Sequence, residues 1–355
     1  MATPTQARTN PLAALSGRKR PETVSSLGLL FVLALVLWLI VNLVKAPADF
    51  VEVSLIGLTT GCLYALIALG YTLVYGILEL INFAHGDVFM LGGMISATLV
   101  SSVWGLTDSS RGLGTWLFVI VTLAIAMTGC GLLNASIEFI AYRPLRSAPR
   151  LAPLITAIGV SFILQDVGLA WKGPNFVSVP NVFPRSKVFS IGGVDYQWNK
   201  LIVVLITIPV LLTLVWLVQY TKQGKAMRAT AQDMDAAAMM GINVNRTVSF
   251  TFVIAGALAG AAGLLYALYV TNVRFDQGFQ LGLIAFTAAV LGGIGNLPGA
   301  VLGAVLIGCI QAWNEGLNWH APGSDWTQSI VFSILILILV FRPEGLLGER
   351  TPEGG

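Results

Sequence analysis

Runs of mainly apolar residues recur along the sequence from Ser25 to Phe341, and this recurrence constrains the fold more than any other feature. A run of about 18 residues or more is long enough to cross a hydrocarbon core about 30 Å thick as an α-helix. Charged residues make up only 10% of the chain, whereas about 25% is usual for soluble domains. The sequence therefore predicts an all-α polytopic membrane protein and excludes an ordinary water-soluble enzyme.

We expect about eight to ten transmembrane helices with some broken or short segments. The expected spans are an additional first helix at 25–45 and then residues 51–75, 88–104, 116–141, 151–171, 201–220, 248–270, 279–293, 298–314 and 327–341. The spans at 88–104, 279–293 and 298–314 are short and rich in glycine, so broken or re-entrant segments are expected among them.

The N-terminus begins with a polar head at 1–24 that carries four basic residues. Ala46-Pro47-Ala48 resembles a signal-peptide cleavage site. However, the preceding run of about 20 apolar residues exceeds the usual signal-peptide core of about 7–15 residues. We therefore expect the helix at 25–45 to be retained.

The placement of the basic residues indicates the orientation of the chain. With a cytoplasmic N-terminus, alternating spans place 76–87, 142–150, 221–247, 294–297 and the C-terminal tail that follows the last span at 341 inside the cell. About 13 Lys and Arg residues are then inside and about 7 are outside, in agreement with the positive-inside rule. We expect both termini to be cytoplasmic.

Two segments between spans are long enough to have structure of their own. At 172–200, prolines and alternating β-branched residues predict an extended flap or hairpin outside the cell. The segment at 221–247 is expected inside. Between Gly224 and Gly241 it is rich in Ala and Met, which predicts one short cytosolic helix.

The expected cytosolic helix is amphipathic. One face is an apolar stripe of Met227, Ala231, Met234 and Ala238. The other face is polar and carries Arg228, Gln232 and Asp235. Such a stripe can dock into a groove of a partner protein, or the helix can lie on the bilayer surface as a connector. Composition leaves both interpretations open.

The end of this segment resembles a known motif. Asp235-Ala236-Ala237-Ala238-Met239-Met240-Gly241 is similar to the EAA-x3-G loop of ABC importer permeases, with Asp in place of Glu. In those permeases the loop is the coupling helix, which sits in a cleft of the cytosolic ATPase. The resemblance implies an ATPase-coupling role for Met227, Arg228, Met234, Asp235, Ala236, Ala237 and Gly241.

Longer segments extend the resemblance over 51–348. They are GLTTGCLYALIALGYTLVYGILELINFAHGDVFMLGG (57–93), EFIAYRPLRS (138–147), TAIGVSFILQD (156–166), MRATAQDMDAAAMMGIN (227–243), TFVIAGALAGAAGLL (251–265) and AFTAAVLGGIGNLPGAVLGA (285–304). These segments closely resemble LivH-type permeases of branched-chain amino acid ABC transporters. The resemblance implies an inner-membrane permease domain at 51–348. It also implies a complex with a LivM-like second permease, two ATP-binding cassette ATPases and an external amino-acid-binding protein.

The segment from Glu79 to Asp87 places two carboxylates, an amide and an imidazole between two expected spans. Ionisable groups at membrane depth are costly, so they usually pair with each other or line a polar path. Asn82, His85, Gly86 and Asp87 are therefore candidate pathway residues. In the alternative structural role, Glu79 and Asp87 lie at the cytoplasmic interface and His85 braces a bend.

A second set of candidate pathway residues lies at 292–299, where proline and glycines cannot continue a regular helix. The set is Gly292, Gly293, Gly295, Asn296 and Pro298. A broken helix in a transporter can expose its ends and carbonyl groups to a substrate. The alternative is that the glycines allow close helix packing.

Several other polar residues lie near the ends of expected spans. Glu138 and Arg143 are expected to form an ion pair at the inner interface. Four residues are expected near the outer face: Gln165, Asp166, Arg274 and Asp276. They either line the outer entrance of a pathway, contact an external protein that delivers the substrate, or are simply residues of the membrane interface.

Several kinds of site are missing from the sequence. There is no GxxxxGK[ST] phosphate-binding loop, since the nearest fragment, at 223–226, lacks its first glycine and its hydroxyl residue. No metal site is expected, because the only two histidines, His85 and His320, are predicted on opposite sides of the membrane. No cofactor is expected either. No basic block indicates nucleic-acid binding.

Together these features predict the membrane-spanning permease subunit of an ATP-driven importer of branched-chain or related small amino acids, with no enzymatic activity of its own. A urea or amide permease of the same family is the alternative for the substrate. The alternative from another class is a carrier driven by an ion gradient, with Glu79, His85 and Asp87 as a proton relay.

Overall fold

The computed structural model describes residues 22–348 except 111, 147, 150, 185, 192 and 343. Within this part of the chain, eight helices are long and apolar enough to cross a membrane. They are α2 (Pro47–Leu78), α3 with its π-helical end (Ala84–Val103), α4 with its two terminal turns (Leu113–Leu145), α5 (Leu151–Lys172), α6 (Trp198–Tyr220), α9 (Val244–Val270), α11 (Leu297–Gly316) and α12 with its first turn (Ser324–Phe341). The predicted all-α polytopic fold is confirmed.

Two further apolar helices are α1 (Glu22–Lys45) and the shorter α10 (Gln277–Gly292). α10 corresponds to one of the short, glycine-rich spans expected from the sequence. Residues 1–21 of the expected polar head and the C-terminal tail at 349–355 lie outside the described residues.

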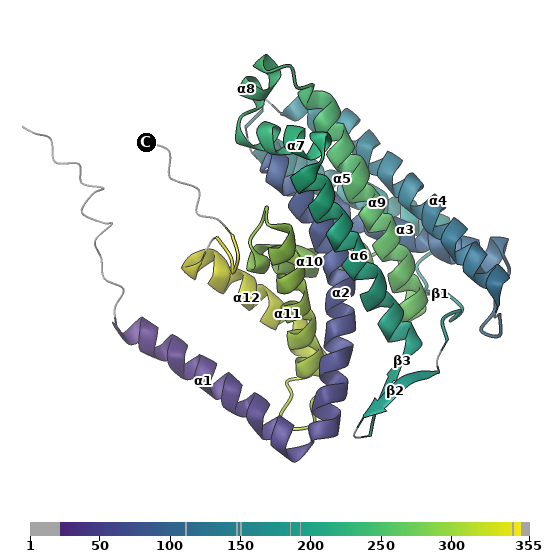
Figure 1. Cartoon of the computed structure of the whole chain (residues 1–355), viewed down its shortest axis with the longest axis vertical. Helices are drawn as coiled ribbons and strands as arrows, with labels where there is room; N and C mark the ends of the chain where they lie inside the picture. Colours follow the sequence, from purple (N-terminus) through teal and green to yellow (C-terminus); the bar gives the residue numbers. More distant parts are fainter. Residues whose placement is uncertain are drawn as a thin grey trace, which may run out of the picture.

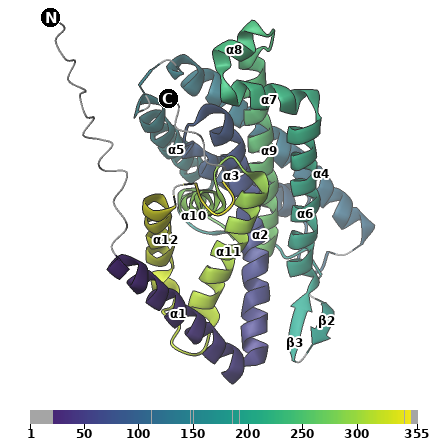
Figure 2. The same cartoon turned by 60° about the vertical axis from the view of Figure 1, so that its left-hand side comes forward.

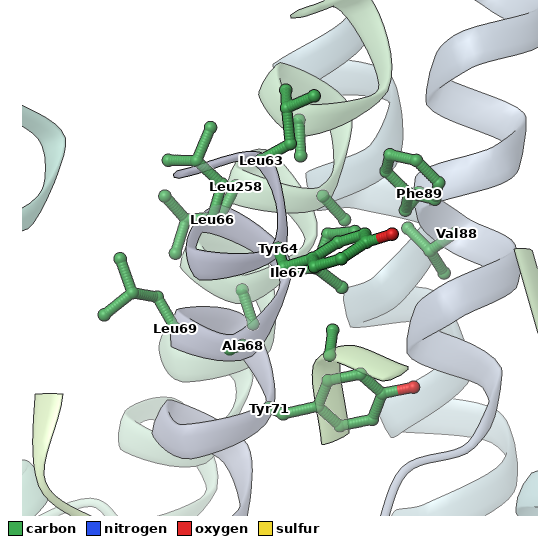
Figure 3. Close-up of a cluster of buried hydrophobic side chains, with 14 of the residues drawn as sticks. Leu63, Tyr64, Leu66, Ile67, Ala68, Leu69, Tyr71, Val88, Phe89 and Leu258 are labelled. Atoms are coloured by element: carbon green, nitrogen blue, oxygen red, sulfur yellow. The ribbon is translucent and has the colours of Figure 1, made fainter. Parts of the chain in front are cut away.

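The helices form a buried centre and an outer layer. α2 and α9 lie at the centre and pack against each other and against α3, while α11 packs along α2 and α4 along α9 (Figure 1). Figure 3 shows side chains of α2, from Leu63 to Tyr71, packed with Val88 and Phe89 of α3 and Leu258 of α9. The outer helices α4, α5, α6 and α12 carry many exposed apolar side chains, as expected for helices in contact with lipid.

Glycines allow the backbones of α2 and α11 to approach closely. A Cβ atom at Gly57 would lie 2.7 Å from the Cα atom of Cys309, and one at Gly61 would lie 2.6 Å from the Cα atom of Val305. Any larger residue at either position therefore needs the two helices to separate. Small residues at such crossings let membrane helices gain van der Waals contact, which stabilises them where lipid supplies no hydrophobic driving force.

The two segments between spans lie at opposite ends of the bundle (Figures 1 and 2). One end carries α7 (Lys222–Gln232) and α8 (Met234–Met239), and the other carries an antiparallel hairpin of β2 (Lys187–Ile191) and β3 (Val194–Gln197). The hairpin confirms the extended structure predicted within 172–200. A second short pairing joins β1 (Val177–Ser178) to β4 (Asn272–Val273).

The prediction of one continuous helix between Gly224 and Gly241 is wrong, because the chain forms two helices that meet at Asp233. The backbone of Asp233 is extended, with φ −158° and ψ 114°, and its carboxylate accepts hydrogen bonds from the backbone N–H groups of Asp235 and Ala236. An aspartate that caps a new helix in this way ends the preceding one. The predicted apolar stripe is therefore divided between α7 and α8.

α1 diverges from the other helices and is fastened mainly near its C-terminal end (Figure 2). The indole Nε1 of Trp38 donates to the backbone oxygen of Trp319 at 2.8 Å, and the Asn42 side chain also bonds to the backbone of Trp319. The Lys45 ammonium lies over the Trp319 ring. These contacts connect α1 to the loop that follows α11.

Replacing Gly61 by alanine is expected to lower the free energy of unfolding by about 1–3 kcal/mol, because the new methyl group overpacks the crossing of α2 and α11. The measurement is thermal unfolding of the purified chain in detergent. Gly159→Ala is the matched control, since a Cβ atom there meets nothing within 4 Å. Equal melting temperatures for the two variants would contradict the close-packing account.

Candidate functional site

The loop that resembles a coupling helix ends in a defined helix cap. After α8, the Ile242 N–H bonds to the Ala237 carbonyl and the Gly241 N–H bonds to the Ala238 carbonyl, both at 3.0 Å. Gly241 has φ +83°, the left-handed conformation that this cap requires and that glycine adopts without strain. The final glycine of the motif therefore turns the chain from α8 into α9.

The exposed surface of α8 differs from the predicted stripe. Met239 and Met240 are 82% and 83% exposed, whereas Ala237 is buried against the body of the protein. Of the predicted coupling residues, Met227 is buried, Met234 and Ala236 are half-buried, and Arg228, Asp235 and Gly241 are exposed. Met239 and Met240 were missed as candidates, although they stand inside the motif. Unbranched methionines adapt readily to a partner surface.

The turn between α2 and α3 places His85 and Gly86 in the interior. His85 is fully buried and packs edge-on against Tyr71, with 4.9 Å between the ring centroids. Gly70 leaves the space for this imidazole, because a Cβ atom at Gly70 would overlap it. Gly86 lies against the backbone of Gly278 and Gly282 at the crossing of α3 and α10. Both residues therefore have a clear packing role.

Asp87 is fully buried among the helices. Its Oδ2 atom accepts hydrogen bonds from the Ser161 hydroxyl and from Gln165 Nε2, both on α5. Its Oδ1 atom has no hydrogen-bond partner among the described residues. Gln165, which was expected near the outer face, therefore reaches the start of α3 and helps to attach α5.

Asn82 is buried in the same turn, and its Oδ1 atom accepts a hydrogen bond from the Tyr142 hydroxyl at 2.7 Å. The Nδ2 atom of Asn82 has no partner among the described residues. Asn82 and Asp87 thus each retain one buried polar atom that can bind a further group.

The break between α10 and α11 is closely packed. The carbonyl oxygens of Leu291 and Gly292 accept hydrogen bonds from the N–H groups of Leu346 and Leu347, so the end of α10 is covered by the chain's own C-terminal segment. A Cβ atom at Gly293 would lie 2.5 Å from the nitrogen of Gly348. This arrangement favours the packing interpretation of Gly292 and Gly293.

The start of α11 is capped by Asn296, whose Oδ1 atom accepts from the Gly299 N–H at 3.0 Å. Its Nδ2 atom donates to the carbonyl of Leu347 at 2.8 Å. Pro298 occupies the first turn of α11, where no intrahelical N–H donor is needed. Gly295 has φ +95° and makes the turn itself.

The structure brings this turn together with α6 and α7. A cavity of about 490 Å³ is lined by Val215, Val218, Gln219, Arg228, Ile294, Gly295, Asn296, Leu297 and Pro298. Arg228 therefore shares one groove with three residues of the second candidate set, Gly295, Asn296 and Pro298. Nothing in their spacing along the sequence indicated that they meet.

A buried charge cluster lies beside the start of α9. Glu138 is fully buried and forms ion pairs with Arg143, at 3.0 Å, and with Arg146. The Ser249 hydroxyl donates to Glu138 at 2.7 Å, and Arg146 donates to Asn245 Oδ1 at 2.7 Å. The predicted ion pair between Glu138 and Arg143 is confirmed, and the cluster also ties the end of α4 to α9.

Arg274 and Asp276, in the turn before α10, form an ion pair with each other. The hydrogen bond from the Arg274 guanidinium holds the pKa of the Asp276 carboxyl below its usual value. The same guanidinium lies over the ring of Phe176. Among the described residues, no group of three or more His, Cys, Asp or Glu side chains could hold a metal ion.

Removing the Glu138 carboxylate by Glu138→Ala is expected to lower the free energy of unfolding by about 3–5 kcal/mol, because it leaves two partly buried arginines without their shared partner. Thermal unfolding in detergent is the measurement. Asp195→Ala breaks the exposed pair with Lys187 and serves as the control, with no measurable change expected. A similar small effect in both variants would show that the cluster is not structural.

Comparisons with known proteins agree with this geometry. Residues 53–340 match the family model described as the permease component of branched-chain amino acid transport systems. The chain is 39% identical over 302 residues to the high-affinity branched-chain amino acid transport permease BraD of Pseudomonas aeruginosa, covering 84% of this chain and 95% of BraD. It is 36% identical over 311 residues to LivH of Escherichia coli K12, covering 86% and 97%.

One solved structure, PsaBC from Streptococcus pneumoniae in complex with a Fab, aligns with a TM-score of 0.42 and 15% identity over 87% of this chain and 97% of that one. The sequence relatives and the family model, in contrast, cover most of the chain at substantial identity. Membrane subunits of this kind are transport components that work with ATPase subunits, and they are not enzymes. The chain belongs to the branched-chain amino acid transport permease family of ABC importers.

Proposed function

We propose that this chain forms the translocation path for branched-chain or related small amino acids in an ATP-driven importer. The observation that carries the proposal is the capped α7–α8 loop, which presents two exposed methionines at one end of a bundle of membrane-spanning helices. The names of BraD and LivH, both high-affinity branched-chain amino acid permeases, support the substrate class. A urea or amide substrate is the alternative.

The proposed complex contains a LivM-like second permease, two ATP-binding cassette ATPases and an external amino-acid-binding protein. This chain has no phosphate-binding loop, so the ATPases must bind and hydrolyse the nucleotide. Met239 and Met240 are proposed to enter the ATPase cleft, with Asp235 and Arg228 beside them.

In the proposed orientation, α7, α8 and both termini are cytoplasmic and the β2–β3 hairpin is external. The excess of Lys and Arg in 142–150 and 221–247 supports this orientation. It is also consistent with the positions of the loop and the hairpin at opposite ends of the bundle (Figure 1).

The contacts of the loop suggest how ATPase closure moves the membrane helices. α7 packs on α6, α2 and α9, and Met227 is buried among them. α8 leads through Gly241 directly into α9, which the Glu138 cluster joins to α4. A displacement of α8 is therefore passed to helices of the buried centre. Asn82 and Asp87 remain the proposed pathway residues, because each has a buried polar atom without a partner among the described residues.

A double substitution, Met239→Glu with Met240→Glu, is expected to reduce co-purification of the ATPase by about tenfold or more. Two carboxylates would have to be desolvated in the cleft, and each tenfold step needs only about 1.4 kcal/mol. The measurement is the ATPase to permease ratio after affinity purification of the complex. Asn175→Glu adds a charge to an exposed position between α5 and β1, away from the α7–α8 loop, and is the control. An unchanged ratio in the double variant would contradict the proposed docking surface.

Uptake of labelled leucine by cells that contain the whole transporter tests the transport function. We expect uptake that disappears when the phosphate-binding loop of the partner ATPase is inactivated. If the cells take up labelled urea and not leucine, the proposed ATP-driven mechanism stands and the substrate is urea instead of an amino acid. Leucine uptake that survives the inactive ATPase would contradict the proposal and favour a carrier driven by an ion gradient.

A further inference from the structure

A small cavity of about 180 Å³ lies at the end of the bundle that carries α7 and α8. Three segments meet around it: the turn after α2, the segment before and at the start of α5, and the start of α8. Its apolar wall consists of Leu78, Leu80, Pro153 and Met234. Two side chains of opposite charge, Arg146 and Glu79, complete most of the lining. The cavity therefore combines an apolar surface with both signs of charge.

The guanidinium of Arg146 is fixed in position by other parts of the chain. Its Nη atoms donate to Glu138 and to Asn245 Oδ1, on α4 and α9. A guanidinium has five N–H donors, and the Nε atom of Arg146 has no partner among the described residues. Glu138 is shared with Arg143, so two positive charges are balanced by a single carboxylate in this cluster. An oriented arginine with excess positive charge around it favours a carboxylate ligand.

A second donor lies next to this cavity. A narrow hollow shares the walls Leu80 and Pro153 with it and is also lined by Asn82 and Tyr142. Asn82 is 3% exposed, and its Nδ2 atom lacks a partner among the described residues. Buried polar groups are normally hydrogen-bonded, and this hollow, at about 10 Å³, has room beside the Asn82 donor for no more than a water molecule.

We propose that this cavity binds a zwitterionic aliphatic amino acid from the cytosol and that the bound amino acid restrains the coupling loop. The carboxylate pairs with Arg146, the ammonium lies toward Glu79, and the aliphatic side chain contacts Leu80 and Met234. The sidedness and the amino acid class rest on the proposed function. A carboxylate has several acceptor positions, so Glu79 can receive the ammonium in addition to other contacts.

The expected effect on the transport cycle follows from the position of Met234. Met234 is the first residue of α8, so a ligand in the cavity contacts the coupling loop itself. A ligand shifts a conformational equilibrium toward the state that it binds best. Amino acid in the cytosol is therefore expected to favour the present arrangement of α8 and to slow ATP hydrolysis by the complex.

The test uses the complex of both permeases and both ATPases in lipid nanodiscs, without the external binding protein. Binding of labelled L-leucine is measured together with ATPase activity. Leucinamide lacks the carboxylate, 4-methylpentanoate lacks the ammonium, and inorganic phosphate tests for a general anion site. We expect both analogues to bind about tenfold more weakly than leucine or worse, because each loses one charged hydrogen bond. We also expect leucine to lower ATPase activity at least about twofold, whereas leucinamide should not.

Ala148→Phe fills the cavity while keeping every side chain of the Glu138 cluster, and it should abolish both leucine binding and its effect on ATPase activity. Ala170→Phe, at an exposed position on α5, is the matched control and should leave both unchanged. The ligand series on the unmodified complex gives a result even if Ala148→Phe fails to fold.

Several results would overturn the proposal. The first is that leucine and leucinamide bind equally, and the second is that phosphate displaces labelled leucine as well as unlabelled leucine does. The third is that a folded Ala148→Phe complex binds leucine as before, and the fourth is that leucine binds without changing ATPase activity. If cells take up leucine in an ATP-driven manner but the complex in nanodiscs does not bind leucine at this cavity, only this proposal is overturned. An absence of leucine uptake by the unmodified transporter would contradict the proposed function itself.

Discussion

Close backbone contact between membrane helices is the constraint on which the rest of the structure depends. Lipid tails are as apolar as leucine side chains, so helices in a bilayer gain little from hiding apolar surface and must gain from tight contact. Gly57 and Gly61 provide that contact between α2 and α11, and Gly86 provides it between α3 and α10. Gly70 instead leaves room for the buried His85 ring. These glycines set how the central helices pack against one another. The helices of this centre in turn position the loops at both ends of the bundle.

Hydrogen bonds at three helix ends define the path of the α7–α8 loop. Asp233 caps α8, Gly241 closes it and Asn243 caps α9, so a few side chains define the whole path of the chain. The side chains of Met239 and Met240 are exposed to solvent, whereas those of Met227 and Ala237 are buried against the helix bundle. A capped loop that also carries exposed, adaptable methionines is suited to contact a partner protein. The Glu138 cluster supports the same function, because it joins α9 to the end of α4 next to that loop.

Much of the candidate site was predictable from residue type and order. The motif around Asp235 predicts a coupling segment, which stays a proposal, whereas the ion pair predicted from the proximity of Glu138 and Arg143 is confirmed. The single cytosolic helix was wrong because Asp233 competes for backbone N–H groups, which an analysis of periodicity does not include. The burial of Asp87 and its bonds to α5 were not predictable, since the partners lie 74 and 78 residues away in the sequence.

By itself, the sequence determined that the chain crosses a membrane repeatedly as helices, because apolar length and low charge leave no other way to satisfy the backbone in lipid. It also determined the family, through motifs that run in order along most of the chain. Only the tertiary structure decided which helices are central, that the end of α10 is covered by Leu346 and Leu347, and that Arg228 shares a groove with Gly295. These features depend on contacts between residues far apart in the chain, and hydrophobic pattern carries no information about which of several similar helices will pack together.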